Sequence, residues 1–170
     1  MRVIGIDPGS RICGWGIVEE SGGPSTLVHV DSGAVFTDSK KPLADRLQHV
    51  YDELRAVIHR FQPQEASIEE VFHHKNARSA LTLGQARGVA VLACVHEGLS
   101  VYEYSPLQIK QAVSGYGRAD KEQVAAMVKA LLHLPEVAWE DTSDALAGAI
   151  CHLNSYRLAR ASRRLTDEGR

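Results

Sequence analysis

The sequence contains few of the residues that mark secreted, disulfide-bonded or membrane-spanning proteins. Only three of its 170 residues are cysteines, Cys13, Cys94 and Cys151, and they lie far apart and match no metal-ligand spacing. We therefore expect buried, reduced thiols rather than a disulfide framework. The longest apolar runs are interrupted by Gly, Arg and His. This pattern argues against a membrane span or an export signal and favours a cytoplasmic protein.

A strong excess of basic charge is also missing. The formal net charge is −2 at pH 7, so composition alone does not indicate a simple basic nucleic-acid-binding protein. If four of the acidic residues hold a divalent metal, however, the remaining residues are slightly positive. The overall charge therefore does not decide whether the protein binds nucleic acid. With 44% hydrophobic residues, a chain of this length is expected to form one compact domain.

The order of the predicted strands and helices indicates an α/β fold. Three short strands separated by turn residues predict an antiparallel meander, and they end near residues 7, 18 and 36. Two further strands are expected at 66–69 and 101–104. Helical spacing or capping signals predict helices at 43–61, 77–96, 106–113, 121–132 and from about Asp141 onward. Together these elements predict a mixed five-stranded sheet flanked by helices.

One domain is expected over residues 1–155, followed by a C-terminal tail. Residues 156–170 are polar and rich in arginine and show no clear core face, so this tail is expected to be mobile. The helix at 77–96 contains many Ala and Gly residues. Small residues let another backbone approach closely, so this helix is expected to make either a tight core contact or a subunit interface.

Four carboxylates are candidates for a single site. Asp7 and Glu69 each end an apolar strand, and a helical crossover between the two strands makes them parallel neighbours whose acids open on the same sheet edge. Asp141 and Asp144 are three residues apart near a helix start, which places both on one helix face. If that helix docks beside the first strand, all four converge.

A site whose ligands are all oxygen atoms suits Mg²⁺ or Mn²⁺, and two such ions can catalyse phosphodiester hydrolysis. Other roles remain open for the single residues. Asp7 precedes Pro8-Gly9 and could form a turn, and Asp141 or Asp144 could cap a helix. Glu69 has no comparable structural role, because a turn does not need Glu at that position. The joint occurrence of the four in a compatible order favours the metal site.

Several sequence blocks carry a resemblance to a known family. They are IGIDPGS at 4–10, IEEVF at 68–72 with Lys75-Asn76, LGQARGV at 83–89 and DTSDALA at 141–147. In this order they resemble the RuvC family of bacterial Holliday-junction resolvases, and the likeness covers nearly the whole chain to about residue 155. Several blocks together are far more specific than any one of them.

The resemblance implies an RNase H-like fold and a metal-dependent endonuclease that acts in homologous recombination and DNA repair. By that likeness the protein is a homodimer, and it resolves four-way DNA junctions by paired, symmetric cuts that leave 5′-phosphate ends. The family's acidic positions correspond to Asp7, Glu69, Asp141 and Asp144. The implied cofactor is Mg²⁺, with Mn²⁺ as a substitute and two ions per site, and the implied partner is the RuvA–RuvB branch-migration complex.

The same resemblance assigns DNA contacts. Phe72 is similar to a family aromatic that stacks on bases at the crossover, although it could instead be a core residue. Lys110 and Lys121 match family lysines near the cut phosphate. The backbone contacts proposed beside them are Lys75, Arg78 and Arg118. Each of these charges could also be an ordinary surface residue, and His73-His74 are interpreted as surface residues.

Two rival functions remain. The opening strand and turn also resemble the first phosphate loop of actin-like ATPases, but the chain is too short for the second half that such proteins need. A junction-binding scaffold without catalysis is the other rival, and the complete set of four acids argues against it. The sequence therefore favours a nuclease and leaves the assembly of its site to be established.

Overall fold

The structure, a computed structural model, describes residues 1–22, 26–70 and 76–168, with only the backbone of 159–168. Its strands are β1 (Arg2–Asp7), β2 (Ile12–Glu20), β3 (Leu27–Phe36), β4 (Glu65–Glu69) and β5 (Ser100–Tyr104). Its helices are α1 (Leu43–Phe61), α2 (Ala77–His96), α3 (Pro106–Ser114), α4 (Lys121–Leu132) and α5 (Glu140–Glu168). Every predicted element is present, with boundaries shifted by a few residues at most except at the end of α5.

The strands form one mixed sheet in the order β3-β2-β1-β4-β5. β1 pairs with β2 and β2 with β3 in antiparallel fashion, which confirms the predicted meander. β1 pairs with β4 and β4 with β5 in parallel, because helical crossovers precede both later strands. The two strands that carry Asp7 and Glu69 are therefore direct neighbours.

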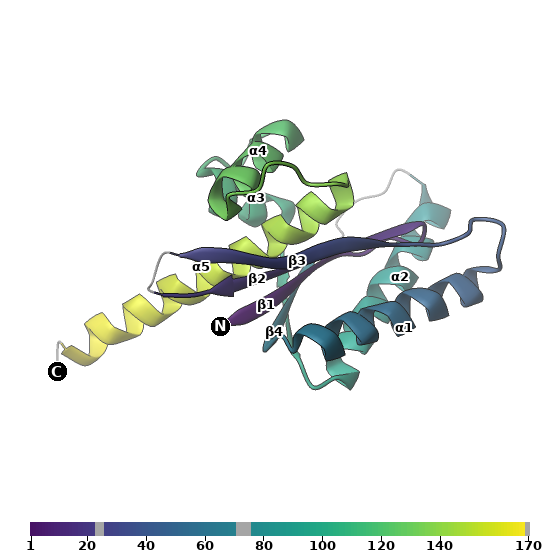
Figure 1. Ribbon diagram of the computed structural model, residues 1–170, viewed down its shortest axis with the longest axis horizontal. Coiled ribbons are helices and arrows are strands. Elements are labelled where there is room, and N and C mark those ends of the chain that lie inside the picture. The colour runs from purple at the N-terminus through teal and green to yellow at the C-terminus, as the bar shows by residue number, and fades with distance from the viewer. Residues whose placement is uncertain (23–25, 71–75, 169–170) are drawn as a thin grey trace.

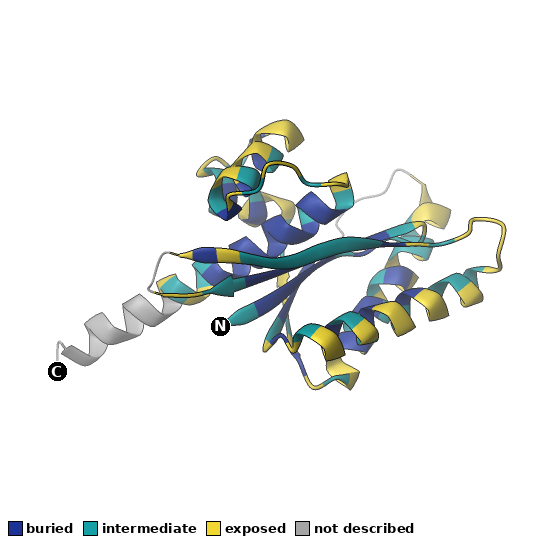
Figure 2. Cartoon of the chain, viewed as in Figure 1, coloured by how far each residue is buried: buried dark blue, intermediate teal, exposed yellow. Residues whose placement is uncertain are grey.

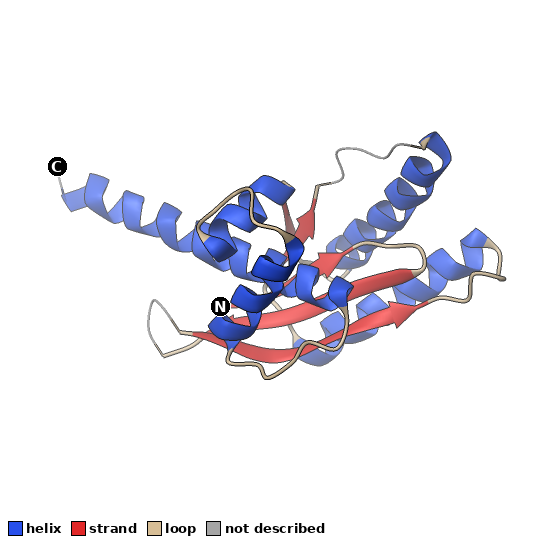
Figure 3. Cartoon of the chain, turned by 90° about the horizontal axis from the view of Figure 1, so that it is seen from above, coloured by secondary structure: helices blue, strands red, loops and turns tan. Residues whose placement is uncertain are grey.

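Helices cover both faces of the sheet (Figures 1 and 3). α1 and α2 pack on one face, where a core forms around Ile4, Ile6 and Ile17. α5 lies across the other face, with α3 and α4 packed on its outer side, and this core includes Val3, Leu146 and further residues of α3 and α4. The central strands are buried from both sides, as Figure 2 shows. The three cysteines are buried and unpaired, as predicted.

Glycines let α5 approach the sheet at backbone distance. A methyl group on Gly5 of β1 would overlap the backbone carbonyl of Ala145, and one on Gly14 of β2 would overlap that of Asp141. A methyl group on Gly16, the direct strand partner of Gly5, would overlap the side chain of Leu146. Glycine inside a strand often marks such a close approach. The first turns of α5 are thus seated on β1 and β2 near Asp7.

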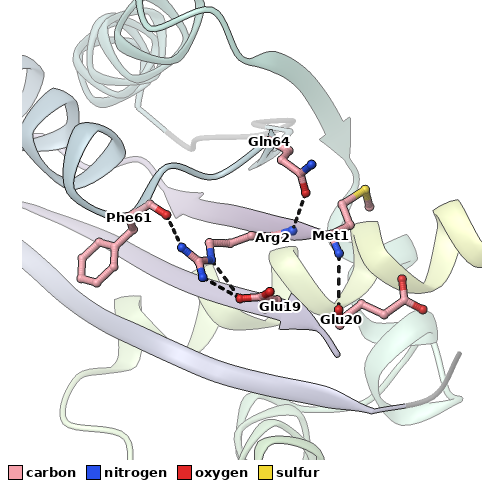
Figure 4. Close-up of polar contacts among 6 residues, drawn as sticks. All are labelled: Met1, Arg2, Glu19, Glu20, Phe61 and Gln64. Atoms are coloured by element: carbon pink, nitrogen blue, oxygen red, sulfur yellow. Dashed lines mark hydrogen bonds and ion pairs between the residues drawn. The ribbon is translucent and has the colours of Figure 1, made fainter. Parts of the chain in front are cut away.

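Arg2 fixes the opposite end of β1 (Figure 4). Its guanidinium donates to the Phe61 carbonyl at 2.5 Å and to Glu19 Oε2 at 2.7 and 3.0 Å, and its backbone N–H donates to Gln64 Oε1 at 3.0 Å. These bonds connect β1 to β2 and to the end of α1. The Arg2–Glu19 ion pair is about one-third exposed, so we expect it to contribute no more than about 1 kcal/mol.

Local signals in the sequence account for several helix ends. Ser105 and Asp120 both form capping boxes, with Gln108 and Gln123 as their partners. α5 continues as a helix through Glu168, so the domain boundary expected at residue 155 falls within a helix. Mobility of residues 156–170 stays a prediction. Within the described ranges, no helix is long and apolar enough to cross a membrane.

We predict that Gly5→Ala will lower the free energy of unfolding by about 1–3 kcal/mol or more, because the added methyl group overlaps the α5 backbone. Chemical denaturation measures the change. Gly33→Ala is the matched control, since the atoms nearest to a methyl group there belong to the Trp15 side chain and not to a backbone. Equal effects of the two substitutions would contradict the claim that Gly5 is needed for the close approach of α5 to β1.

Candidate active site

Asp7 and Glu69 lie side by side at one edge of the sheet and face α5. The preceding residues, Ile6 and Ile68, are direct partners in the parallel pairing of β1 and β4. Gly5 contacts α5, so Asp7, two residues later, lies on the same face of β1. Ser67 donates a hydrogen bond to a carbonyl of α5 at 2.9 Å, and Glu69 follows it by two residues on β4. The predicted common edge is therefore present.

The first turns of α5 bring Asp141 and Asp144 to the same edge. Gly14, against which Asp141 packs, is the direct strand partner of Asp7. Thr142 donates to the Gly33 carbonyl at 3.1 Å, which holds the start of α5 over β3 as well. The close approach to the sheet thus carries both helix acids to the strand that ends in Asp7.

Three of the carboxylates, Asp7, Glu69 and Asp144, have raised pKa values. Burial, followed by the charges of Asp144, Glu69 and Asp141, raises the pKa of Asp7 to about 8. Burial is also the main cause that raises the pKa of Glu69, followed by the charge of Asp144. The pKa of Asp144 is raised by burial as well. Burial and like charge both disfavour the ionised forms, so the site carries negative charge that the protein compensates only in part.

Two lysines supply that partial compensation. Lys121 Nζ lies 2.5 Å from Glu140 Oε1 and 3.3 Å from Asp144 Oδ2. Its charge lowers the pKa of Asp7, Glu69 and Asp144 relative to what burial alone would give. Lys110 of α3 acts in the same direction on Glu69. Both predicted lysines therefore lie within electrostatic reach of the carboxylates.

The carboxylates are close but do not form a ready-made cage. Among the described residues, no three His, Cys, Asp or Glu side chains form a group that could hold a metal ion as they stand. The donor set nevertheless fits a hard divalent cation, because it consists of carboxylate oxygens whose ionised forms lack sufficient positive charge nearby. Asp7, Glu69, Asp141 and Asp144 are the residues that would hold such an ion.

The alternative structural roles find little support in the contacts. Within residues 1–22, 26–70 and 76–168, no hydrogen bond or ion pair reaches the carboxylates of Asp7, Glu69 or Asp141. An Asp that forms a turn or caps a helix accepts a backbone N–H bond. By contrast, Asp120 does cap α4 in this way.

A basic groove adjoins the carboxylates. Its volume is about 650 Å³, and Asp141 lies in its wall. Three arginines line it, Arg11 from the β1–β2 turn, Arg46 from α1 and Arg78 from α2. Arg46 donates to Ser10 and Thr37, which are neutral, and in the described part of the chain none of the three arginines pairs with a carboxylate. The groove therefore keeps an uncompensated positive charge beside the acidic cluster.

The other predicted DNA contacts have mixed outcomes. Arg118 is exposed in the connection between α3 and α4, and Arg78 is exposed in the first turn of α2. Phe72, Lys75 and the pair His73-His74 lie outside the described residues, so their predicted roles stay predictions. The predicted set does not include Arg11 or Arg46. Arg11 follows Asp7 by only four residues, a signal that could have indicated it, whereas nothing in the sequence places Arg46 beside it.

Relatives of known name resemble the chain closely. The family described as Crossover junction endodeoxyribonuclease RuvC matches residues 3–152. The protein of that name from Pelobacter propionicus is 59% identical over 162 residues, which is 95% of this chain and 91% of the relative. That from Geobacter sulfurreducens is 57% identical over 155 residues, 91% of this chain and 93% of the relative.

Solved structures show the same fold. RuvC of T. thermophilus in complex with Holliday junction substrate aligns with a TM-score of 0.88 and 35% identity, over 94% of this chain and 96% of that chain. The yeast mitochondrial Holliday junction resolvase Ydc2 aligns with a TM-score of 0.71 over 99% and 86% of the two chains, but its 12% identity supports the fold alone. These matches confirm the expected RNase H-like fold.

We predict that the pKa of Asp7 makes the metal-free protein less stable as pH rises from about 4 to about 8. The folded state keeps a proton on Asp7, whereas the unfolded chain releases it near the ordinary pKa of 3.8. Each unit by which the pH rises in this window therefore lowers the free energy of unfolding. Asp7→Asn should remove the effect, and its advantage over the unsubstituted protein should reach a few kcal/mol at pH 8.

Urea denaturation in EDTA at pH 5 and pH 8 measures this difference. Asp52→Asn, an exposed position of α1, is the control and should follow the pH dependence of the unsubstituted protein. If Asp7→Asn raised the free energy of unfolding by the same amount at both pH values, the assignment of a raised pKa to Asp7 would be wrong.

Proposed function

The chain belongs to the RuvC family of crossover junction endodeoxyribonucleases, and from this premise we propose how its residues perform the reaction. The protein cuts four-way DNA junctions. Asp7, Glu69, Asp141 and Asp144 bind the divalent metal, which we propose to be Mg²⁺, with Mn²⁺ as a substitute and two ions per site. The observation that carries this proposal is the raised pKa of Asp7, caused by burial and by the other three carboxylates.

Bound divalent ions would activate a water molecule and stabilise the leaving oxygen of the phosphodiester. The protein's own residues supply position and charge. The strand ends and α5 hold the carboxylates at one edge of the sheet. Lys121 Nζ and Lys110 lie beside the acids, where they can contact oxygens of the strand to be cut. Paired cuts that leave 5′-phosphate ends are the products we propose.

DNA would follow the positive charge next to the site. We propose that Arg11, Arg46 and Arg78 contact backbone phosphates in the basic groove, and that Arg118, exposed between α3 and α4, also contacts the backbone. Such contacts orient the duplex without reading its sequence. Lys75, and Phe72 as a stacking residue, complete the proposed DNA-binding set on the strength of the family resemblance.

A homodimer follows from the two-fold symmetry of the junction, and α2 offers a surface for it. One face of α2 packs on the core through Ala86, Ala90 and Ala93. The opposite face exposes large apolar side chains, Leu81 (71%), Leu92 (57%) and Val95 (56%). On that face Gly84 and Gly88 have open space around them, which leaves room for a second helix. We propose this face of α2 as the dimer contact.

The remaining assignments rest on the family alone. A partnership with the RuvA–RuvB branch-migration complex and a cytoplasmic location are proposals of this kind.

We predict that Asp7→Asn will reduce the cutting rate by about a thousand-fold or more, because the metal contributes several kcal/mol to the reaction. Binding of a synthetic four-way junction in EDTA should stay unchanged or tighten. The assay incubates the junction, or a linear duplex of the same sequence, with Mg²⁺, Mn²⁺ or EDTA and maps nicks on all strands. Asp52→Asn is the control and should cut normally. Junction binding without cuts by the unsubstituted protein under every metal would instead indicate a scaffold.

We predict that Leu92→Glu will turn the dimer into a monomer, because it places a charge in the apolar contact of α2. Light scattering after gel filtration should then give the mass of one chain, 18.6 kDa, instead of twice that value. Leu107→Glu on α3, which is similarly exposed at 62%, should leave the dimer intact. A dimer that survives Leu92→Glu would place the contact elsewhere.

A further inference from the structure

A buried histidine connects α5 to the strands beneath it. His152 is only 2% exposed. Its Nε2 lies 2.6 Å from Glu65 Oε2 of β4, and its Nδ1 lies 2.8 Å from the hydroxyl of Tyr104 of β5. The ring of Tyr102 packs against it in a tilted arrangement, with a centroid distance of 4.5 Å and an interplanar angle of 40°. Nothing in the proposed chemistry uses this cluster.

One tautomer of His152 satisfies both hydrogen bonds of this cluster. An imidazole with its proton on Nε2 donates to the Glu65 carboxylate and accepts the Tyr104 O–H at Nδ1. Both ring nitrogens are satisfied, so the side chain is held in one orientation by two different strands. A buried network that is fully satisfied in this way resists displacement.

The cluster connects the elements that carry the carboxylates. His152 follows Asp144 by eight residues, which corresponds to about 12 Å along the helix. On the sheet, Tyr104 is the direct partner of Glu69 in the pairing of β4 and β5, and its carbonyl accepts a bond from Glu70 at 2.9 Å. The triad Glu65–His152–Tyr104 therefore connects the helix that carries Asp144 to the strands that hold Glu69.

Most other contacts of α5 are made to β1, β2 and α3, and few reach β4 and β5. Gly5 and Gly14 let the helix backbone approach β1 and β2, and the side chains of Leu146, Ile150 and Leu153 are buried in the core on that face. The Arg157–Glu20 ion pair connects α5 to β2, and Asn154 donates to Ala112 of α3. The sheet is also reached by single neutral hydrogen bonds, from Thr142 to Gly33 and from Ser67 to Gly148. The triad adds two bonds to one rigid ring, one of them to a carboxylate, which is a stronger type.

We propose that Glu65, His152 and Tyr104 are positioning residues that set the place of α5 along the sheet and thereby the distance of Asp141 and Asp144 from Asp7 and Glu69. This inference rests on the proposed metal site. A displacement of about 1 Å at a reacting centre lowers rates by as much as about 100-fold. Loss of the triad therefore changes metal binding and turnover while the basic groove, and with it junction binding, is unaffected.

The test compares His152→Ala and Tyr104→Phe with variants on the opposite face of the sheet. Tyr51→Phe is the matched control, because it removes a similar tyrosine–histidine bond, to His96, between α1 and α2. Leu54→Ala, a buried residue of α1, is a control for lost stability. For each variant we would measure the melting temperature, the affinity for Mn²⁺ without DNA by calorimetry, junction affinity in EDTA, and kcat with saturating junction.

We expect His152→Ala to lower kcat by about 10- to 100-fold and to weaken Mn²⁺ binding, with junction affinity in EDTA unchanged. Tyr104→Phe should show the same changes to a smaller degree. Glu65→Gln keeps an acceptor for Nε2–H and should retain most of the metal affinity, whereas Glu65→Leu should behave like His152→Ala. Neither Tyr51→Phe nor Leu54→Ala should change Mn²⁺ affinity.

The proposal is overturned if His152→Ala and Tyr104→Phe lower the melting temperature as Leu54→Ala does but leave Mn²⁺ affinity and kcat unchanged. Should His152→Ala fail to fold, Tyr104→Phe decides, because it removes a single hydroxyl group. Calorimetry separates this result from a failure of the proposed function. If the unsubstituted protein binds Mn²⁺ but cuts no junction, the proposed activity is wrong and the effect of the triad on Mn²⁺ affinity is still measured.

Discussion

The close packing of α5 against β1 and β2 is the constraint on which the rest of the structure depends. Two of the four candidate ligands come from strand ends and two from a helix more than 130 positions along the chain from Asp7. They meet only because Gly5, Gly14 and Gly16 remove the side chains that would hold the helix away. The sheet positions Asp7 and Glu69 by itself, whereas Asp141 and Asp144 reach the site only if the helix lies directly on the backbone.

Burial and charge repulsion both oppose the assembly of the carboxylate site. The raised pKa values of Asp7, Glu69 and Asp144 show that burial and mutual repulsion disfavour the charged forms that a metal needs. Cores on both faces of the sheet supply the stability that offsets this cost. Lys121 compensates part of the charge without filling the site. The fold thus holds in place a set of carboxylates that would otherwise separate, which is what a binding site for divalent cations requires.

Much of this arrangement could be predicted from the sequence, and the reasons differ by element. The parallel pairing of β1 and β4 follows from the helical crossover, and it places Asp7 and Glu69 together with little ambiguity. The docking of α5 was predicted only conditionally, because its orientation depends on which face of the strands the glycines occupy. Arg46 could not be predicted, since its position beside Arg11 arises from the packing of α1. The bonds of His152 span 48 and 87 residues and leave no local signal.

The central claim is that residues from β1, β4 and α5 form one metal site. Anomalous diffraction from crystals grown with Mn²⁺ tests it most directly. The account predicts Mn²⁺ peaks bounded by Asp7, Glu69, Asp141 and Asp144, with Lys121 no longer paired to Asp144. Peaks confined to other acidic residues, or an empty site in protein that cuts junctions in the same buffer, would contradict it.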